Sequence, residues 1–208
     1  MRKSDELLHP LEYYDRERNV TAKLRSSFDD VREAAQNTIG KKFDPEGTSS
    51  STTLKTKYFI SEHSPIRSFD VRIILHDVYY PTSVSFCRHV HSTPYVKTNR
   101  ADRTNQKRSL DNSTDHMFDS NAQSLIDMMR KRLCIGCCSQ DVYLWALEIK
   151  KKLILNPDTY ELGLCLVPGC VYRGGCPEFS PCNAFGHCTG GIEERYELYH
   201  SSLMETKK

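Results

Sequence analysis

Side chains suited to binding anions and flat rings are concentrated in residues 88–103 of this 208-residue chain. Arginine offers a rigid fork of N–H donors that fits phosphate, and threonine adds a hydroxyl donor. The stretch supplies arginines, histidines, lysine and hydroxyl groups, among them Arg88, His89, His91, Lys97, Thr98, Arg100 and Arg103. These residues fit either a ligand site or a solvated basic loop, so the elements around them must decide between the two.

Two other groups of polar residues would have to lie beside this stretch to complete a site. His63 precedes residues 69–75, where apolar and polar side chains alternate as in a β-strand. Residues 121–133 have helical periodicity, and this helix can place polar residues along one side: Asn121, Ser124 or Asp127, and Arg132. The ordinary interpretations are a loop histidine and an amphipathic helix with a polar outer face.

The remaining periodicities predict further strands and helices of an α+β fold. Residues 20–24 alternate as a strand does, and Ser27 is a suitable N-cap for a helix that stops at Gly40. Pro81 suits the first turn of a helix that continues to His89. Residues 105–119 are polar and predict a loop, whereas residues 142–155 predict a helix whose Lys150–Lys152 run is a solvated face.

Composition and charge limit the class of protein. The net charge is only +2 with 27% charged residues, which argues against a nucleic-acid-binding surface. No apolar run could span a membrane, and the first residues lack the apolar core of a signal peptide, so we expect a cytoplasmic protein. We predict a polar arm over residues 1–18, one domain over residues 19–164, and a Cys-rich segment with a charged tail over residues 165–208.

The cysteines are the second notable group of residues. Four of the nine recur at intervals of six residues: Cys170, Cys176, Cys182 and Cys188. Zinc sites usually have shorter spacings within each pair of cysteines, so free thiols are favoured and no metal ligand is assigned. Cys87 is interpreted as a buried helix thiol rather than a nucleophile.

The order and spacing of these motifs resemble the flavin-dependent thymidylate synthases. That family has Arg-His-Arg, seven residues, and then Ser; this chain has Arg88-His89-Val90, seven residues, and then Thr98-Asn99-Arg100. The family also has a His-containing turn before a strand, which His63 matches, and a helix that opens with Asn and carries Arg eleven positions later. Asn121 and Arg132 have that interval. The resemblance extends from about residue 20 to about residue 155, and a phage-like branch of the family has a similar Cys-rich segment.

The resemblance implies a single α+β domain with a mixed sheet packed against long helices, assembled as a homotetramer with sites between subunits. It implies methylation of dUMP at C5 to give dTMP. Methylenetetrahydrofolate would be the carbon donor, and FAD reduced by NADPH would supply the hydride. Neither nucleic acid nor a membrane is expected as a partner.

The resemblance also implies roles for individual residues. The flavin would be held by residues from three parts of the chain: His63, Arg88, His89, Asn121 and Asp127. The nucleotide phosphate would be held by Thr98, Asn99 and Arg100. Arg132 would be both a substrate-binding and the catalytic residue, because a guanidinium at the uracil edge stabilises the negative charge that develops on the ring.

The chain departs from the family motif at several positions. Val90 replaces the second arginine, Ser85 stands where glutamine is common, and Ser68-Phe69 stands where Glu-His is expected. These changes leave open hydroxymethylation of a pyrimidine nucleotide at C5, or an inactive relative. A hypothesis of a different class also stays open, namely a non-enzymatic, metal-stabilised interaction module built on the Cys-rich segment.

Overall fold

The computed structural model describes residues 18–47, 50–98, 100–104, 113–182, 184 and 190–205. Its four strands are β1 (Val20–Leu24), β2 (Asp70–Tyr79), β3 (Thr93–Val96) and β4 (Ser113–Asn121). They form one sheet in the order β1-β2-β4-β3, and every pairing is antiparallel. The predicted α+β single domain is confirmed, whereas the expectation of a mixed sheet is wrong for the described strands.

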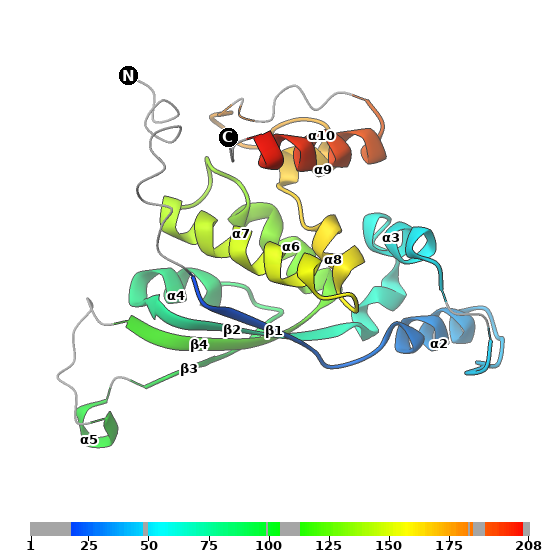
Figure 1. Ribbon diagram of the computed structural model, residues 1–208, viewed down its shortest axis with the longest axis horizontal. Helices are drawn as coiled ribbons and strands as arrows, with labels where there is room; N and C mark the ends of the chain where they lie inside the picture. Colours follow the sequence, from blue (N-terminus) through cyan, green and yellow to red (C-terminus); the bar gives the residue numbers. More distant parts are fainter. Residues whose placement is uncertain are drawn as a thin grey trace.

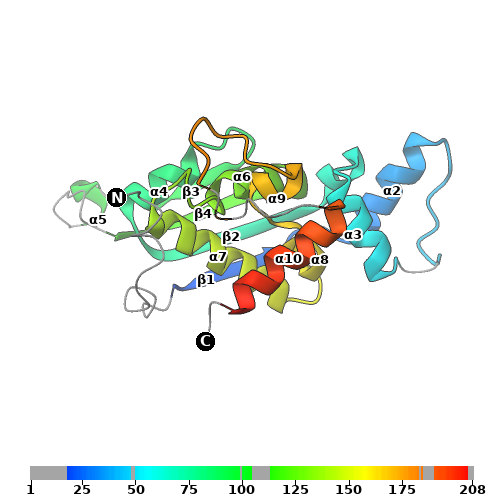
Figure 2. The same ribbon diagram turned by 90° about the horizontal axis from the view of Figure 1, so that it is seen from above.

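Helices cover one face of this sheet (Figures 1 and 2). The ones that pack on the sheet are α4 (Tyr80–Cys87), α6 (Ala122–Arg132) and α7 (Gln140–Leu155), and α8 (Tyr160–Cys165) packs against α7. α10 (Ile192–Glu205) and α9 (Gly169–Arg173) lie above them as an outer layer (Figure 1). The remaining helices lie at the two ends of the sheet: α2 (Phe28–Thr38), α3 (Thr52–Ile60), the 3-10 helix η2 (Ser64–Ser68) and α5 (Ala101–Thr104).

Alternation along β2 explains which face the helices cover. Val71, Ile73 and Leu75 are fully buried, as expected for side chains that share one face of a strand. Arg72 points to the other face, where it forms two hydrogen bonds of 2.6 Å with Asp119 of β4. The predicted strand over residues 69–75 is therefore confirmed, with bounds of Asp70–Tyr79.

The predicted helix boundaries are mostly confirmed. The backbone N–H and the hydroxyl of Ser27 both donate to the Asp30 carboxylate, at 2.6 and 2.9 Å, and these bonds lower the pKa of Asp30. Gly40 follows α2 with a left-handed φ of 69°. The helix after Pro81 ends at Cys87 instead of reaching His89, and Cys87 is exposed, so its interpretation as a buried thiol is wrong.

The predicted loop over residues 105–119 is wrong where the structure describes it. Residues 113–121 form β4, the strand beside β2, while residues 105–112 lie outside the described residues. The strand was hidden because polar side chains occupy its buried positions: Thr114, His116 and Ser120 alternate with exposed or half-buried ones. β3 was missed as well, because it is a short edge strand with no buried residue.

The basic run of α7 is only partly a solvated face. Lys150 is 2% exposed, and its Nζ donates to the carbonyls of Gly163 and Leu166 at 2.8 Å and lies 3.1 Å from His200 Nε2. Burial lowers the pKa of this ammonium group to about 7. Lys150 thus joins α7 to the end of α8 and to α10, which the sequence did not indicate.

The division of the chain at residue 165 stays a prediction, and the predicted arm over residues 1–18 lies outside the described residues except for Arg18. Within the described part of the chain, no helix has both the length and the apolar character needed to cross a bilayer.

We expect Lys150→Met to destabilise the protein, because it leaves buried carbonyl oxygens without their donor. The free energy of unfolding should fall by roughly 2 kcal/mol in urea titrations. Lys151→Met is the matched control on the same helix, since Lys151 is exposed and forms a surface ion pair with Glu148. Equal stability of the two variants would contradict the structural role of Lys150.

Candidate active site

Two of the predicted site residues meet where the ends of α4 and α6 come together. Arg132, the last residue of α6, donates from Nε to His89 Nε2 at 3.1 Å. Its Nη2 donates to the backbone carbonyl of Ser85, in α4, at 2.5 Å. The basic motif and the arginine of the following helix are therefore brought together by tertiary packing, 43 positions apart in sequence.

No carboxylate among the described residues balances the charge of Arg132. Arg72, Arg100 and Arg130 each pair with an aspartate or glutamate. By contrast, no ion pair joins Arg132 to any carboxylate of the described residues. Burial, and then the nearby charge of Arg88, lower the pKa of Arg132.

His89 stays neutral in this position. Burial, and then the Arg132 charge, lower its pKa to about 4. A neutral imidazole can accept the Arg132 hydrogen bond, whereas an imidazolium would repel the guanidinium. Arg132 is therefore held by two neutral acceptors, and the exposed Arg88 adds a second positive charge nearby.

A buried histidine lies behind α4. His116 of β4 is 0% exposed, and its Nδ1 lies 3.0 Å from the Ser83 hydroxyl. Its ring packs edge-on against Phe86 and Phe118, and Nε2 has no hydrogen-bond partner among the described residues. Burial lowers the pKa of His116 to about 4, so this side chain is a neutral part of the core.

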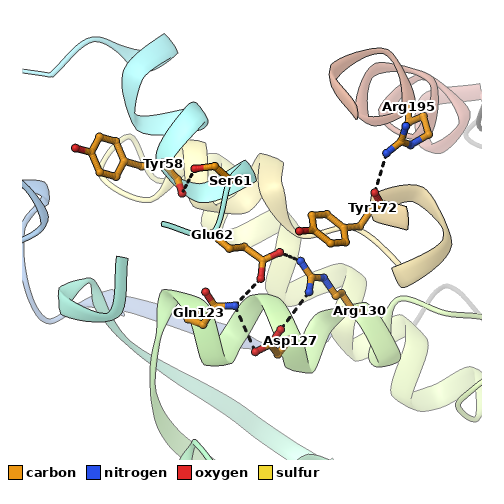
Figure 3. A network of polar contacts seen from close by, with 8 residues as sticks. All are labelled: Tyr58, Ser61, Glu62, Gln123, Asp127, Arg130, Tyr172 and Arg195. Atoms are coloured by element: carbon orange, nitrogen blue, oxygen red, sulfur yellow. Dashed lines mark hydrogen bonds and ion pairs between the residues drawn. The ribbon is translucent and has the colours of Figure 1, made fainter. Parts of the chain in front are cut away.

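A second polar cluster lies on the other side of α6 (Figure 3). Glu62 pairs with Arg130 and accepts a hydrogen bond of 2.6 Å from Gln123. The Arg130 guanidinium also lies 3.8 Å from the centre of the Tyr172 ring and 3.2 Å from Asp127. Glu62 has a left-handed φ of 51°, which is uncommon for a residue with a side chain. Arg130 and Glu62 were not among the predicted site residues, and the nearest predicted residues were Arg132 and His63.

The residues predicted on the flavin side lie in different environments. Asn121 is the N-cap of α6, and its Oδ1 accepts 3.0 Å bonds from the Ser124 backbone N–H and hydroxyl. Asp127 belongs to the Glu62–Arg130 cluster and not to the side of the helix that carries Arg132. His63 packs edge-on against Tyr58 and lines a groove of about 350 Å³ between α3 and Glu193.

The residues predicted to bind phosphate lie on the surface. Thr98 is exposed, and its hydroxyl accepts a 3.3 Å bond from the Arg100 backbone N–H. The Arg100 guanidinium forms a two-pronged contact with Asp102, at 3.0 and 2.7 Å. Asn99 lies outside the described residues. Among the described residues, no hydrogen bond or ion pair joins this group to Arg132, so its role stays a prediction.

The described part of the Cys-rich segment and Val90 add no further group to the candidate site. Among the described residues, no three Cys, His, Asp or Glu side chains are gathered closely enough to hold a metal ion. Cys188 lies outside those residues. Val90, which replaces the motif arginine, is 89% exposed and so contributes no buried contact.

Comparisons with known proteins place the fold but not the family. The fold is an antiparallel sheet covered by helices on one face. It is similar to the crystal structure of the UMP/dUMP methylase PolB from Streptomyces cacaoi bound with 5-Br dUMP, at a TM-score of 0.51 and 11% identity, covering 69% of this chain and 94% of that one. A second structure of that methylase, bound with 5-Br UMP, gives 0.47 and 12%, covering 70% and 94%. No family model matches the sequence. No curated protein matches it either.

We expect His116 to make folding sensitive to acid. Its pKa is about 4 in the folded chain and about 6.5 when unfolded, so the unfolded state binds more protons between these values. Stability should therefore fall as the pH drops through this window, by up to about 1.4 kcal/mol per pH unit from this residue. Urea unfolding of His116→Gln should show a shallower pH dependence than the parent protein. The exposed His91→Gln control should keep the parent slope, and an unchanged slope in His116→Gln would contradict the assignment.

Proposed function

We propose that this chain is an enzyme that binds a pyrimidine nucleoside monophosphate and modifies its C5 position. The finer proposal is flavin-dependent methylation of dUMP to dTMP, with FAD, NADPH and methylenetetrahydrofolate, as in the flavin-dependent thymidylate synthases. The fold shared with a UMP/dUMP methylase supports the nucleotide class. The motif Arg88-His89, with Thr98-Asn99-Arg100 and then Asn121 and Arg132, supports the flavin-dependent type.

One observation carries the proposal. A half-buried guanidinium, Arg132, is fixed by two neutral acceptors and has no carboxylate partner among the described residues. Buried charges normally have an opposite charge beside them, because removing a charge from water is costly. We infer that the nucleotide supplies this negative charge. In the proposed reaction Arg132 would stabilise charge that builds up on the pyrimidine when C5 acts as the nucleophile.

Three of the residues predicted to hold the flavin have side chains that are compatible with one. Arg88 offers an exposed guanidinium for phosphates, and Asn121 keeps its carboxamide N–H donors free of the cap, which uses only its oxygen. The half-exposed Asp127 carboxylate could accept hydrogen bonds from a ribose. When bound, reduced FAD would supply the hydride; the protein would bind and orient the reactants. We also expect the homotetramer of the family, with each site completed by a second subunit.

We expect Arg132→Ala to weaken dUMP binding by about 10- to 100-fold, the loss of a hydrogen-bonded contact to a charged ligand group. Isothermal titration calorimetry with dUMP measures this change. Arg173→Ala is a suitable control, because Arg173 is an exposed arginine at the end of α9. Equal dUMP affinity in the Arg132→Ala variant and the parent protein would remove Arg132 from the nucleotide site.

We expect the purified protein to be yellow, with flavin absorbance that elutes with it in gel filtration. The second expected readout is C5-tritium release from labelled dUMP, which requires added NADPH and methylenetetrahydrofolate. A colourless protein that binds dUMP but gains no activity from added FAD would contradict the flavin-dependent type. It would leave the broader nucleotide-binding proposal standing.

A further inference from the structure

Two cysteines are the first and last residues of a turn that follows α6. Leu133 is the C-cap of α6, and the backbone N–H of Cys137 then donates to the carbonyl of Cys134 at 3.1 Å. This is the hydrogen bond of a four-residue turn, which keeps its first and last Cα atoms within about 7 Å. A disulfide needs Cα atoms about 4.4–6.8 Å apart, so the backbone already has a suitable geometry.

The two thiols also influence each other. The Cys134 thiol is among the groups that raise the pKa of Cys137. Both cysteines are free, with Cys134 buried and Cys137 half-buried, so a small molecule can reach Cys137 first. Gly136 lies between them, and a Cβ at that position would be 3.7 Å from Cys182 Sγ. The turn therefore packs against the Cys-rich segment.

Neither metal binding nor the proposed reaction accounts for this pair. No third ligand is close enough to complete a metal site within the described part of the chain. The proposed C5 chemistry requires no cysteine of the protein. Cys138 is occupied differently, since its thiol donates to the carbonyls of Arg132 and Cys134 at 3.3 Å.

We propose that Cys134 and Cys137 are a thiol–disulfide exchange site that a small-molecule disulfide, such as glutathione disulfide, converts to a reversible intramolecular disulfide. The Cys137 thiolate attacks the small disulfide, forms a mixed disulfide and releases one thiolate. The Cys134 thiolate then attacks Cys137 Sγ, forms the Cys134–Cys137 bond and releases the second thiolate. Two protein thiols are oxidised, the small disulfide is reduced to two thiols, and the two protein protons end on the released thiolates.

The surroundings of Cys137 make the exchange slow at neutral pH. Burial, the Cys134 thiol and the Glu178 carboxylate raise the pKa of Cys137 well above its usual value. Because the thiolate is the attacking species, the rate should rise about tenfold per pH unit below that pKa. The Glu178 carboxylate is also paired with Lys131.

The test is oxidation of the folded, full-length protein by glutathione disulfide, followed by alkylation, trypsin digestion and mass spectrometry. Residues 133–150 form one tryptic peptide with Cys134, Cys137 and Cys138, whereas Cys170 lies in a different one, residues 153–173. We expect the first peptide to lose about 2 Da and to escape alkylation at two positions, with reversal by dithiothreitol. The exposed Cys87 is the internal control, and its reaction should stop at the mixed disulfide.

Variants separate this pairing from its alternatives. Cys138→Ser should keep the oxidised peptide. Cys134→Ser should stop at a mixed disulfide on Cys137, and Cys137→Ser, which lacks the attacking thiol, should not form the oxidised peptide. Oxidised peptide that persists in Cys134→Ser would overturn the pairing in favour of Cys137 and Cys138. A cross-link between peptides 133–150 and 153–173, or thiols that react only after a chelator is added, would also overturn it.

Discussion

The candidate site depends on one electrostatic constraint: the Arg132 guanidinium is held without a negative partner among the described residues. Its two acceptors are a backbone carbonyl, which cannot move independently of α4, and a histidine that burial keeps neutral. An aspartate in either place would have neutralised the charge and closed the site to anions. The arrangement fixes the direction of the guanidinium. In the proposed function its charge would act on a ligand, as electrostatic preorganisation does in catalysis on a developing anion.

The rest of the fold keeps α4 and α6 in place around this contact. β2 leads directly into α4, and β4 leads directly into α6 through the Asn121 cap. Because β2 and β4 are paired along most of their length, the starts of the two helices are set by the sheet register. On the opposite side of α6, Arg130 pairs with Glu62 and lies against the Tyr172 ring. These contacts hold the helix against the end of α3 and against α9. Rotation of α6, which would carry Arg132 away from His89, is opposed on both sides.

The sequence predicted the parts of the fold that have a regular pattern of apolar residues. β1, α2, α6 and α7 were found because their apolar positions recur with the period of a strand or a helix. β4 was missed because His116, Thr114 and Ser120 occupy its buried face, so its alternation is one of burial and not of hydrophobicity. Lys150 was misinterpreted for a similar reason, since its partners are carbonyl groups that have no signature in the sequence.

The candidate site was predictable only in part. The resemblance selected Arg132 and His89, which do meet, but it could not distinguish them from Asp127, which faces the other side of α6. Helical spacing gives only the angle between two residues around the helix axis. The elements packed around α6 determine that Arg132 meets His89 and that Asp127 lies beside Arg130. Thr98 and Arg100 are exposed, so the pattern of apolar residues in the sequence does not indicate what they contact.

A double-mutant cycle between His89 and Arg132 tests the central claim most directly. The dUMP affinities of the parent protein, His89→Ala, Arg132→Ala and the double variant would be measured by calorimetry under the same conditions. Our account predicts a coupling free energy of at least about 1 kcal/mol, because His89 acts on the nucleotide through the position of Arg132. Additive effects within about 0.5 kcal/mol, or no effect of either substitution, would contradict it.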